Sequence, residues 1–253
     1  MSDSLLNIHD DGIAVLTFNR PHARNALDLD TMRRFAELIP SLAVESGFRV
    51  LILTGAGEAA FCSGGDLADL SQYPSVEDAA SMISLMGDAL LSLEHLPVPV
   101  IAAINGYALG GGSEIAVACD LRIVDQQAWM GFVQIRLGLT PGWGGGQRLM
   151  RLVGYAKALE ILLEGRPMHA DELLALRLVN RVVPTGTALH HALDFARHIA
   201  QFSPDVVRAV KRLLQAGLNE EYEDALQDER SAFPPLWAAE AHLKAVEKFL
   251  GKR

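Results

Sequence analysis

The sequence predicts an α/β fold that ends in a helical region. Apolar runs typical of buried strands alternate with amphipathic helical segments, which favours strands joined by right-handed crossovers. From about Gly144 onward nearly every segment has helical spacing. The 253 residues are 50% apolar and 21% charged, so the chain can bury a core without a disulfide or a metal. We therefore expect an α/β core at residues 1–190 and a helical region at 191–253.

The first half of the chain alternates strands with helices. Apolar and polar residues alternate on both sides of Asp11-Gly12, which indicates a β-hairpin. Asp28 or Asp30 is suited to cap the next helix, which should run to about Val44. Further helices are expected at 76–96 and 113–118. Buried strands are expected at 50–54, 98–104, 121–124 and 129–133, with glycine-containing loops at 55–65 and 105–112.

The second half of the chain is mainly helical, with one expected strand at 178–183. The helices from Pro204 onward carry more apolar residues than a lone surface layer needs, so we expect this tail to take part in an oligomer. The expected helices cover residues 149–163, 170–176, 188–200, 204–217, 220–231 and 239–250.

Charge and composition exclude several classes of protein. Twenty-two Lys and Arg residues against 31 Asp and Glu give a net charge of −9, which disfavours nucleic acid and anionic membranes as partners. No apolar window is long enough to span a membrane. Cys62 and Cys119 form no CxxC pair and no HExxH or P-loop pattern occurs, so we expect no metal site. The polar start of the chain does not resemble a signal peptide, which makes a reducing cytoplasm the expected location.

A dinucleotide site is one interpretation of the segment from Gly55 to Ala60. This segment follows a strand and fits the relaxed pattern G-x-G-x-x-A. The pattern indicates a dinucleotide site only where a helix opens directly on the glycines. Residues Cys62 to Gly65 follow too closely to allow such a helix. We therefore expect no nicotinamide or flavin cofactor.

Two glycine-rich loops stand out because each follows a buried strand. The first spans Phe61 to Leu67, and the second spans Asn105 to Gly112 and opens a helix that carries Glu114. Backbone N–H groups at such turns can point into one cavity and bind an oxyanion, with support from the helix N-terminus. Either loop alone is as well explained by a tight turn. Two loops with a carboxylate between them favour an oxyanion site.

Four segments carry a resemblance to a known family: residues 60–67, 103–114, 118–122 and 137–149. Through them the sequence is identified as a member of the enoyl-CoA hydratase/isomerase, or crotonase, superfamily, and residues 20–27 resemble its N-terminal coenzyme A motif. The resemblance implies a crotonase-like ββα spiral core and a C-terminal helical trimerisation region, often in a dimer of trimers. It also implies an acyl-CoA thioester as substrate. Coenzyme A would then be part of the substrate, with no tightly bound cofactor.

The resemblance also assigns roles to single residues. The backbone N–H groups of Gly65 and Gly111 would bind the thioester oxygen and stabilise a thioester enolate, with Glu114 as acid or base. The family often carries a Lys where this chain has Ala68, so one phosphate contact must come from elsewhere. The residues that would contact the adenine and pantetheine parts of coenzyme A are Arg24, Ala26, Cys62, Gly64, Asp66 and Leu67.

Gln134 departs from the pattern of the hydratases that this chain resembles. Those enzymes carry two glutamates on opposite walls of the site, of which one matches Glu114 and the other aligns with Gln134. An amide cannot exchange a proton at neutral pH as a carboxylate does. Enoyl-CoA isomerases use the carboxylate at this second position, and dienoyl-CoA isomerases and aryl dehalogenases would need an Asp at Gly142. Gln134 can still orient a water molecule or a substrate carboxylate.

Three functions stay open. A hydratase would have to act with Glu114 alone. Decarboxylation of an alkylmalonyl-CoA needs the oxyanion site, a dry pocket and one proton donor, which Glu114 would be if burial raises its pKa. Residues 61–64, 132–133, 142–145 and 225–230, followed by Trp237, also resemble the ethylmalonyl-CoA decarboxylase branch. A non-catalytic member that binds coenzyme A or RNA is disfavoured by the net charge of −9 and the intact loop glycines.

Overall fold

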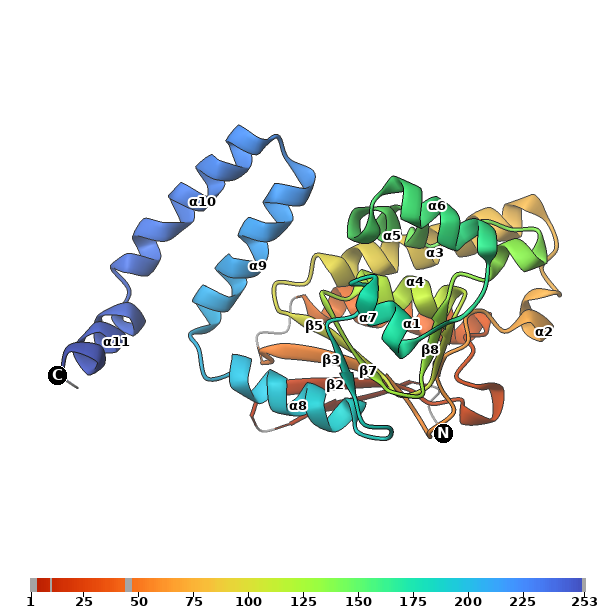
Figure 1. Cartoon of the computed structure of the whole chain (residues 1–253), viewed down its shortest axis with the longest axis horizontal. Coiled ribbons are helices and arrows are strands. Elements are labelled where there is room, and N and C mark those ends of the chain that lie inside the picture. The colour runs from red at the N-terminus through yellow and green to blue at the C-terminus, as the bar shows by residue number, and fades with distance from the viewer. Residues whose placement is uncertain (1–3, 10, 44–46, 252–253) are drawn as a thin grey trace.

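The computed structural model describes residues 4–9, 11–43 and 47–251, and it has the predicted α/β fold. Figure 1 shows a body of sheet and helices, from which α9, α10 and α11 extend. We call these last helices the arm. Within the described residues, no helix is long and apolar enough to cross a membrane.

The larger sheet has the strand order β1-β2-β3-β5-β7-β10. β1 and β2 pair antiparallel as the predicted hairpin, and every later pair is parallel. Strands β3 and β5 are buried along their whole length, as expected for a parallel sheet covered on both faces. The strands of this sheet are β1 (Ser4–Ile8), β2 (Ile13–Phe18), β3 (Val50–Gly55), β5 (Val100–Ile104), β7 (Leu121–Asp125) and β10 (Arg181–Val183).

The smaller sheet has the order β4-β6-β8-β9. Consecutive strands β3-β4, β5-β6 and β7-β8 each give one strand to each sheet before a helix follows, which is a ββα repeat. The prediction of loops at 55–65 and 105–112 was wrong in part, because β4 and β6 lie there; strands this short, next to glycines, show no alternation. The strands are β4 (Ala60–Cys62), β6 (Tyr107–Leu109), β8 (Trp129–Gly131) and β9 (Met168–His169).

Helices connect these strands. The side chain of Asp28 caps α1 by accepting a hydrogen bond from the Thr31 N–H at 2.8 Å, while the predicted helix end at Val44 lies outside the described residues. The single helix predicted at 149–163 is two helices, because Gly154 adopts a φ of +79° and ends the first. The helical segments are η1 (Pro21–Ala23), α1 (Leu29–Leu42), α2 (Leu67–Leu70), α3 (Val76–Glu94), α4 (Gly111–Ala118), η2 (Gln134–Leu137), α5 (Gly145–Val153), α6 (Tyr155–Glu164) and α7 (Ala170–Ala175).

Two apolar clusters pack on opposite faces of the larger sheet. On one face the ring of Phe18 lies 5.9 Å from that of Phe35 and 5.5 Å from that of Phe61, measured between centroids. On the other face α8 (Ala188–Ile199) covers β3 and β5 with its buried alanines, Ala192 and Ala196. Small side chains let this helix lie close to the sheet, so α8 belongs to the packed body.

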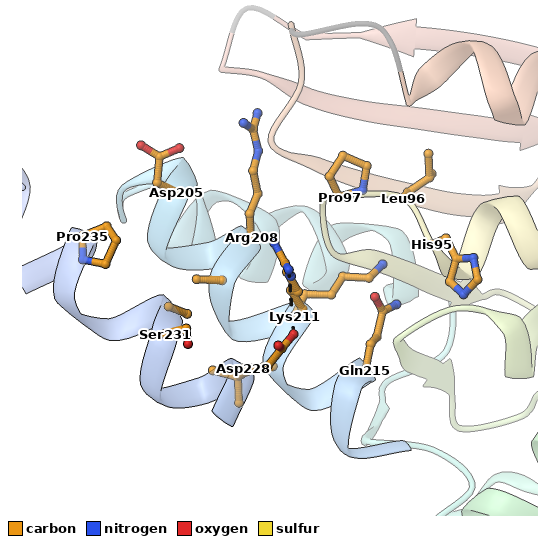
Figure 2. Close-up of a pocket in the computed structure, with 14 residues that line it drawn as sticks. His95, Leu96, Pro97, Asp205, Arg208, Lys211, Gln215, Asp228, Ser231 and Pro235 are labelled. Atoms are coloured by element: carbon orange, nitrogen blue, oxygen red, sulfur yellow. Dashed lines mark ion pairs between the residues drawn. The ribbon is translucent and has the colours of Figure 1, made fainter. Parts of the chain in front are cut away.

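Polar contacts of α9 join the arm to the body. The Nζ of Lys211 donates hydrogen bonds to the Asp120 carboxylate at 2.7 Å and to the Val98 carbonyl at 3.0 Å. The Nε2 of Gln215 donates to the Glu94 carbonyl at 2.5 Å. Figure 2 shows Lys211 and Gln215 pointing from α9 toward the turn after α3, beside a cavity of about 590 Å³.

The arm leaves large apolar side chains exposed. α10 passes the predicted end at Ser231 and continues through Pro234 and Pro235 to Trp237, so that predicted bound was wrong. Phe233 and Trp237 are 60% and 59% exposed. The arm helices are α9 (Pro204–Asn219), α10 (Tyr222–Trp237) and α11 (Glu240–Leu250).

Candidate active site

The two glycine-rich loops touch at the N-terminus of α4. Gly64 adopts a φ of +98°, and a Cβ added there would lie 3.0 Å from the Gly111 nitrogen. Leu27 holds the first loop in place: its N–H donates to the Gly64 carbonyl and its carbonyl accepts from the Asp66 N–H, both at 2.8 Å. The close approach of the two loops therefore requires a glycine at position 64.

The backbone N–H groups of Gly65 and Gly111 have no protein acceptor within the part of the chain that the structure describes. The N–H of Gly111 is the first of α4, where a helix offers no internal acceptor. Gly111 also lies against the ring of Trp143, so a Cβ added there would be 2.1 Å from the ring. Two unused N–H groups on touching loops are suited to bind one oxyanion.

Glu114 lies one turn into α4 and is 2% exposed. Its Oε1 accepts hydrogen bonds from Gln134 Nε2 at 2.9 Å and from the Gly142 N–H at 3.3 Å. Its Oε2 accepts from the N–H groups of Trp143 and Gly145, both at 2.8 Å. The carboxylate is thus held by one side chain and by the backbone of a single loop.

The glycines of this loop allow its backbone N–H groups to reach the Glu114 carboxylate. Gly144 adopts a left-handed φ of +89° just before α5, which turns successive N–H groups toward the carboxylate. A Cβ added to Gly145 would lie 2.4 Å from the Cγ of Glu114, and one added to Gly142 would lie 2.3 Å from the Cδ1 of Ile83. Side chains at these positions would displace the donors.

Burial raises the pKa of Glu114 above its ordinary value, and the hydrogen bonds from Gly145, Gly142, Trp143 and Gln134 oppose that rise. Burial is the larger effect. A carboxyl group in this environment can hold a proton closer to neutral pH than an exposed glutamate can, which suits it to proton transfer.

Only the nitrogen of the Gln134 side-chain amide makes a hydrogen bond within the described residues. Its Nε2 donates to Glu114, while its Oε1 is buried and has no hydrogen-bond partner in the described residues. An unpaired buried carbonyl oxygen is costly, so this atom is suited to accept a hydrogen bond from a bound ligand or a water.

The residues that the resemblance assigns to coenzyme A gather beside the first loop. Arg24 is in a left-handed turn, with φ of +52°, and its carbonyl accepts a hydrogen bond from the Ser63 N–H at 3.1 Å. Ala26 precedes Leu27, which binds Gly64. Leu67 is 59% exposed. The contact of these residues with coenzyme A stays a prediction.

Asp66 and Cys62 differ from the others because their side chains are already engaged. The carboxylate of Asp66 pairs with Arg20 at 3.0 Å and caps α2 by accepting from the Ala68 N–H at 3.2 Å. Cys62 is fully buried, and burial raises the pKa of its thiol to about 12. Any contact of Cys62 with a ligand must therefore use its backbone.

Sequence reasoning used residues 142–145 only for the resemblance and for the aspartate that Gly142 lacks, and it missed that their backbone N–H groups hold Glu114. The run Gly142-Trp143-Gly144-Gly145 was a usable signal, because glycines in sequence free backbone N–H groups to bind an anion. Among the described residues, no group of three His, Cys, Asp or Glu side chains is placed to hold a metal ion.

Comparison with known proteins identifies the family of this chain. The family model described as enoyl-CoA hydratase/isomerase matches residues 9–253. The chain belongs to the enoyl-CoA hydratase/isomerase family. Its fold is therefore the crotonase fold, and the ββα repeats are the turns of the spiral core that the resemblance implied.

Relatives within the enoyl-CoA hydratase/isomerase family carry more than one kind of name. A short-chain-enoyl-CoA hydratase of Clostridium acetobutylicum is 38% identical over 95% of this chain and 92% of its own length. An ethylmalonyl-CoA decarboxylase of Xenopus laevis is 35% identical over 96% of this chain and 82% of its own. The crystal structure of an enoyl-CoA hydratase from Bacillus anthracis superposes with a TM-score of 0.94, at 34% identity, over 100% of this chain and 97% of that one.

Proposed function

We propose that the protein is an acyl-CoA lyase that forms a thioester enolate, and that its reaction is the decarboxylation of an alkylmalonyl-CoA. The observation that carries this proposal is the contact between Glu114 and Gln134. Glu114 has a raised pKa and is held by four neutral donors, and its side-chain neighbour is an amide. Among the described residues, the site thus offers one carboxyl group for proton transfer, and none of its hydrogen-bond partners carries a charge that would repel a substrate carboxylate.

The proposed step follows from this arrangement. The thioester oxygen binds the N–H groups of Gly65 and Gly111. The bond between the α-carbon and the substrate carboxylate breaks, CO₂ leaves, and the electron pair forms an enolate whose oxygen those two N–H groups stabilise. Glu114 then gives its proton to the α-carbon and regains one from solvent.

Gln134 suits both protonation states of Glu114. Its Nε2 donates to the carboxylate, as observed at 2.9 Å. When Glu114 is protonated, rotation of the amide by a half turn presents the unpaired Oε1 as an acceptor for the new O–H. A glutamate at position 134 would instead add a charge.

Hydration of an enoyl-CoA is the second candidate, and the unpaired Oε1 of Gln134 favours it. A water bound to this oxygen would lie beside Glu114. Glu114 would take a proton from that water, whose oxygen adds to the β-carbon, and would then return a proton to the α-carbon of the enolate. The name of the Clostridium relative supports this alternative.

A pocket for the acyl group is available beside the oxyanion loops. A cavity of about 390 Å³ lies between α1, α2 and α3, and Leu70 forms part of its wall. The Cδ1 of Leu70 lies 2.6 Å from where a Cβ on Gly65 would be, so the cavity adjoins the first loop. Its other lining residues include Tyr73, Met82 and Leu85.

One experiment tests the proposed reaction. The protein is incubated with ethylmalonyl-CoA, methylmalonyl-CoA, malonyl-CoA and crotonyl-CoA, and the products are identified by mass. Loss of CO₂ from an alkylmalonyl-CoA at a rate above that of crotonyl-CoA hydration is expected. Hydration that is faster than every decarboxylation would favour the second candidate. No turnover of any of these thioesters would contradict both.

We also propose that the protein assembles as a trimer or a dimer of trimers through its arm. Apolar side chains of the arm that are more than half exposed need a cover that the monomer does not supply. Light scattering at micromolar concentration should give three or six times the mass of 27.4 kDa. A monomeric mass would contradict the assembly and leave the chemistry untouched. The exposed residues that this argument uses are Leu214, Leu218, Phe233, Trp237 and Phe249.

A further inference from the structure

Arg148 lies behind the loop that holds Glu114. It is on α5, and its Nη1 donates a hydrogen bond to the Trp143 carbonyl at 2.9 Å. The N–H of the same residue, Trp143, donates to Glu114 Oε2 at 2.8 Å. One residue therefore separates the guanidinium group from the carboxylate.

The guanidinium group also fills the space beside Gly144. A Cβ added to Gly144 would lie 2.5 Å from the Nη1 of Arg148, and the Arg148 N–H donates to the Gly144 carbonyl at 3.2 Å. The loop is thus held from two sides, by Glu114 in front and by Arg148 behind. Three of the four residues at 142–145 are glycine, so the backbone of this loop is held by these hydrogen bonds and by the packing of the Trp143 ring against Gly111.

Glu94 fixes Arg148 in turn. Its Oε2 accepts from Arg148 Nε at 2.8 Å, and the two side chains are 21% and 11% exposed. The carbonyl of Glu94 accepts from Gln215 of α9, whose side chain Figure 2 shows reaching toward this end of α3. Glu94 thus lies between the arm and the loop. Arg151 approaches the same carboxylate only at 3.8 Å and is 44% exposed.

We propose that Arg148 is a positioning residue that, fixed by Glu94, holds the N–H donors of residues 142–145 around Glu114. This inference rests on the proposed function only in taking Glu114 as the group that transfers a proton. No partner of the Glu114 carboxylate is charged: they are the Gln134 amide and three backbone N–H groups. Loss of those donors removes the interactions that oppose the rise of its pKa.

The test compares the full chain with Arg148→Gln, Arg148→Lys and the matched control Arg151→Gln. Glutamate is labelled with ¹³C at the side-chain carboxyl, and the Glu114 resonance is assigned from a Glu114→Gln spectrum. The midpoint of its pH titration should move to higher pH in Arg148→Gln, less so in Arg148→Lys, and not at all in Arg151→Gln. The unfolding temperature of each variant shows whether it is folded.

Turnover gives a second measurement. With a thioester that the wild type converts, Arg148→Gln should lower kcat about tenfold or more and leave KM within about twofold, because the substrate contacts remain while the proton donor is displaced. A folded Arg148→Gln protein with an unchanged Glu114 midpoint would overturn the inference. A wild type without activity would contradict the proposed function, while the titration would still decide the role of Arg148.

Discussion

Substitution of Gln134 by Glu puts the proposed reaction to its sharpest test. The amide nitrogen lies 2.9 Å from Glu114 Oε1, so the new carboxylate would face Glu114 at about that distance. At an effective dielectric near 20, two unit charges this close repel by about 6 kcal/mol. The pair would therefore keep one proton between its two carboxyl groups at neutral pH. That is the acid and base arrangement that two-carboxylate hydration needs.

The same change should harm decarboxylation. A substrate carboxylate about 4 Å from the new charge meets a repulsion of about 4 kcal/mol, which partial exposure of position 134 reduces. We expect alkylmalonyl-CoA turnover to fall about 100-fold and crotonyl-CoA hydration to rise about 100-fold. Both rates are measured on one preparation by following the products by mass.

Gln134→Met is the matched control, since it removes the amide and adds no charge. It should lower decarboxylation less than Gln134→Glu does and leave hydration where it was. If Gln134→Glu changed neither rate, position 134 would not face the acyl group, and the reasoning from the Glu114–Gln134 contact would be refuted.

Four further predictions follow from the geometry. Glu114→Gln should lower kcat by about 10³ while coenzyme A binding by calorimetry stays within about tenfold. In the wild type, decarboxylation should be constant below the raised pKa of Glu114 and decline above it, because the protonated form is the donor; a rate that rises with pH through this range would contradict that role. Gly111→Ala drives a Cβ to 2.1 Å from the Trp143 ring and should lower activity about 100-fold, whereas Gly87→Ala, with no atom within 4 Å, should raise stability by roughly 1 kcal/mol and leave activity unchanged. Lys211→Ala removes the ion-pair partner of the Asp120 carboxylate, which is 28% exposed and keeps its hydrogen bond from the Val100 N–H, and should cost about 2 kcal/mol of unfolding free energy in denaturant titrations; a loss below about 0.5 kcal/mol would mean that this ion pair does not secure the arm.

The fold could be predicted where the pattern is long. The strand at 50–54 and the helix from Val76 are each a sustained apolar pattern, and the structure places them within a residue or two of the expected bounds. The short strands β4 and β6 could not be seen, because three residues between glycines carry no period. The helix break at Gly154 could not be predicted either, because a helix often tolerates a lone glycine within an apolar stripe. The break depends on the φ of +79° that Gly154 adopts, which the sequence does not show.

The candidate site, like the fold, could be predicted from the sequence only in part. Glu114 and Gln134 were singled out through the resemblance, but the sequence does not show how close they are; the structure places Gln134 Nε2 2.9 Å from Glu114 Oε1, although the two residues are 20 positions apart. The backbone donors at 142–145 could not be predicted from the sequence, because nearly every residue carries a backbone N–H and the sequence does not show where each one points. Arg148 was also missed, since its role depends on where the Trp143 carbonyl points.

The hydrogen bonds that hold the Glu114 carboxylate have a consequence for the evolution of this sequence. Three of the four donors are main-chain N–H groups, which no substitution other than one to proline removes, so changes of side chain elsewhere leave Glu114 in place as long as the loop glycines persist. Position 134 supplies the fourth donor from a separate segment, η2. If decarboxylation and two-carboxylate hydration differ at position 134 as proposed above, a single codon change there would separate one reaction from the other and leave the main-chain donors of Glu114 where they are.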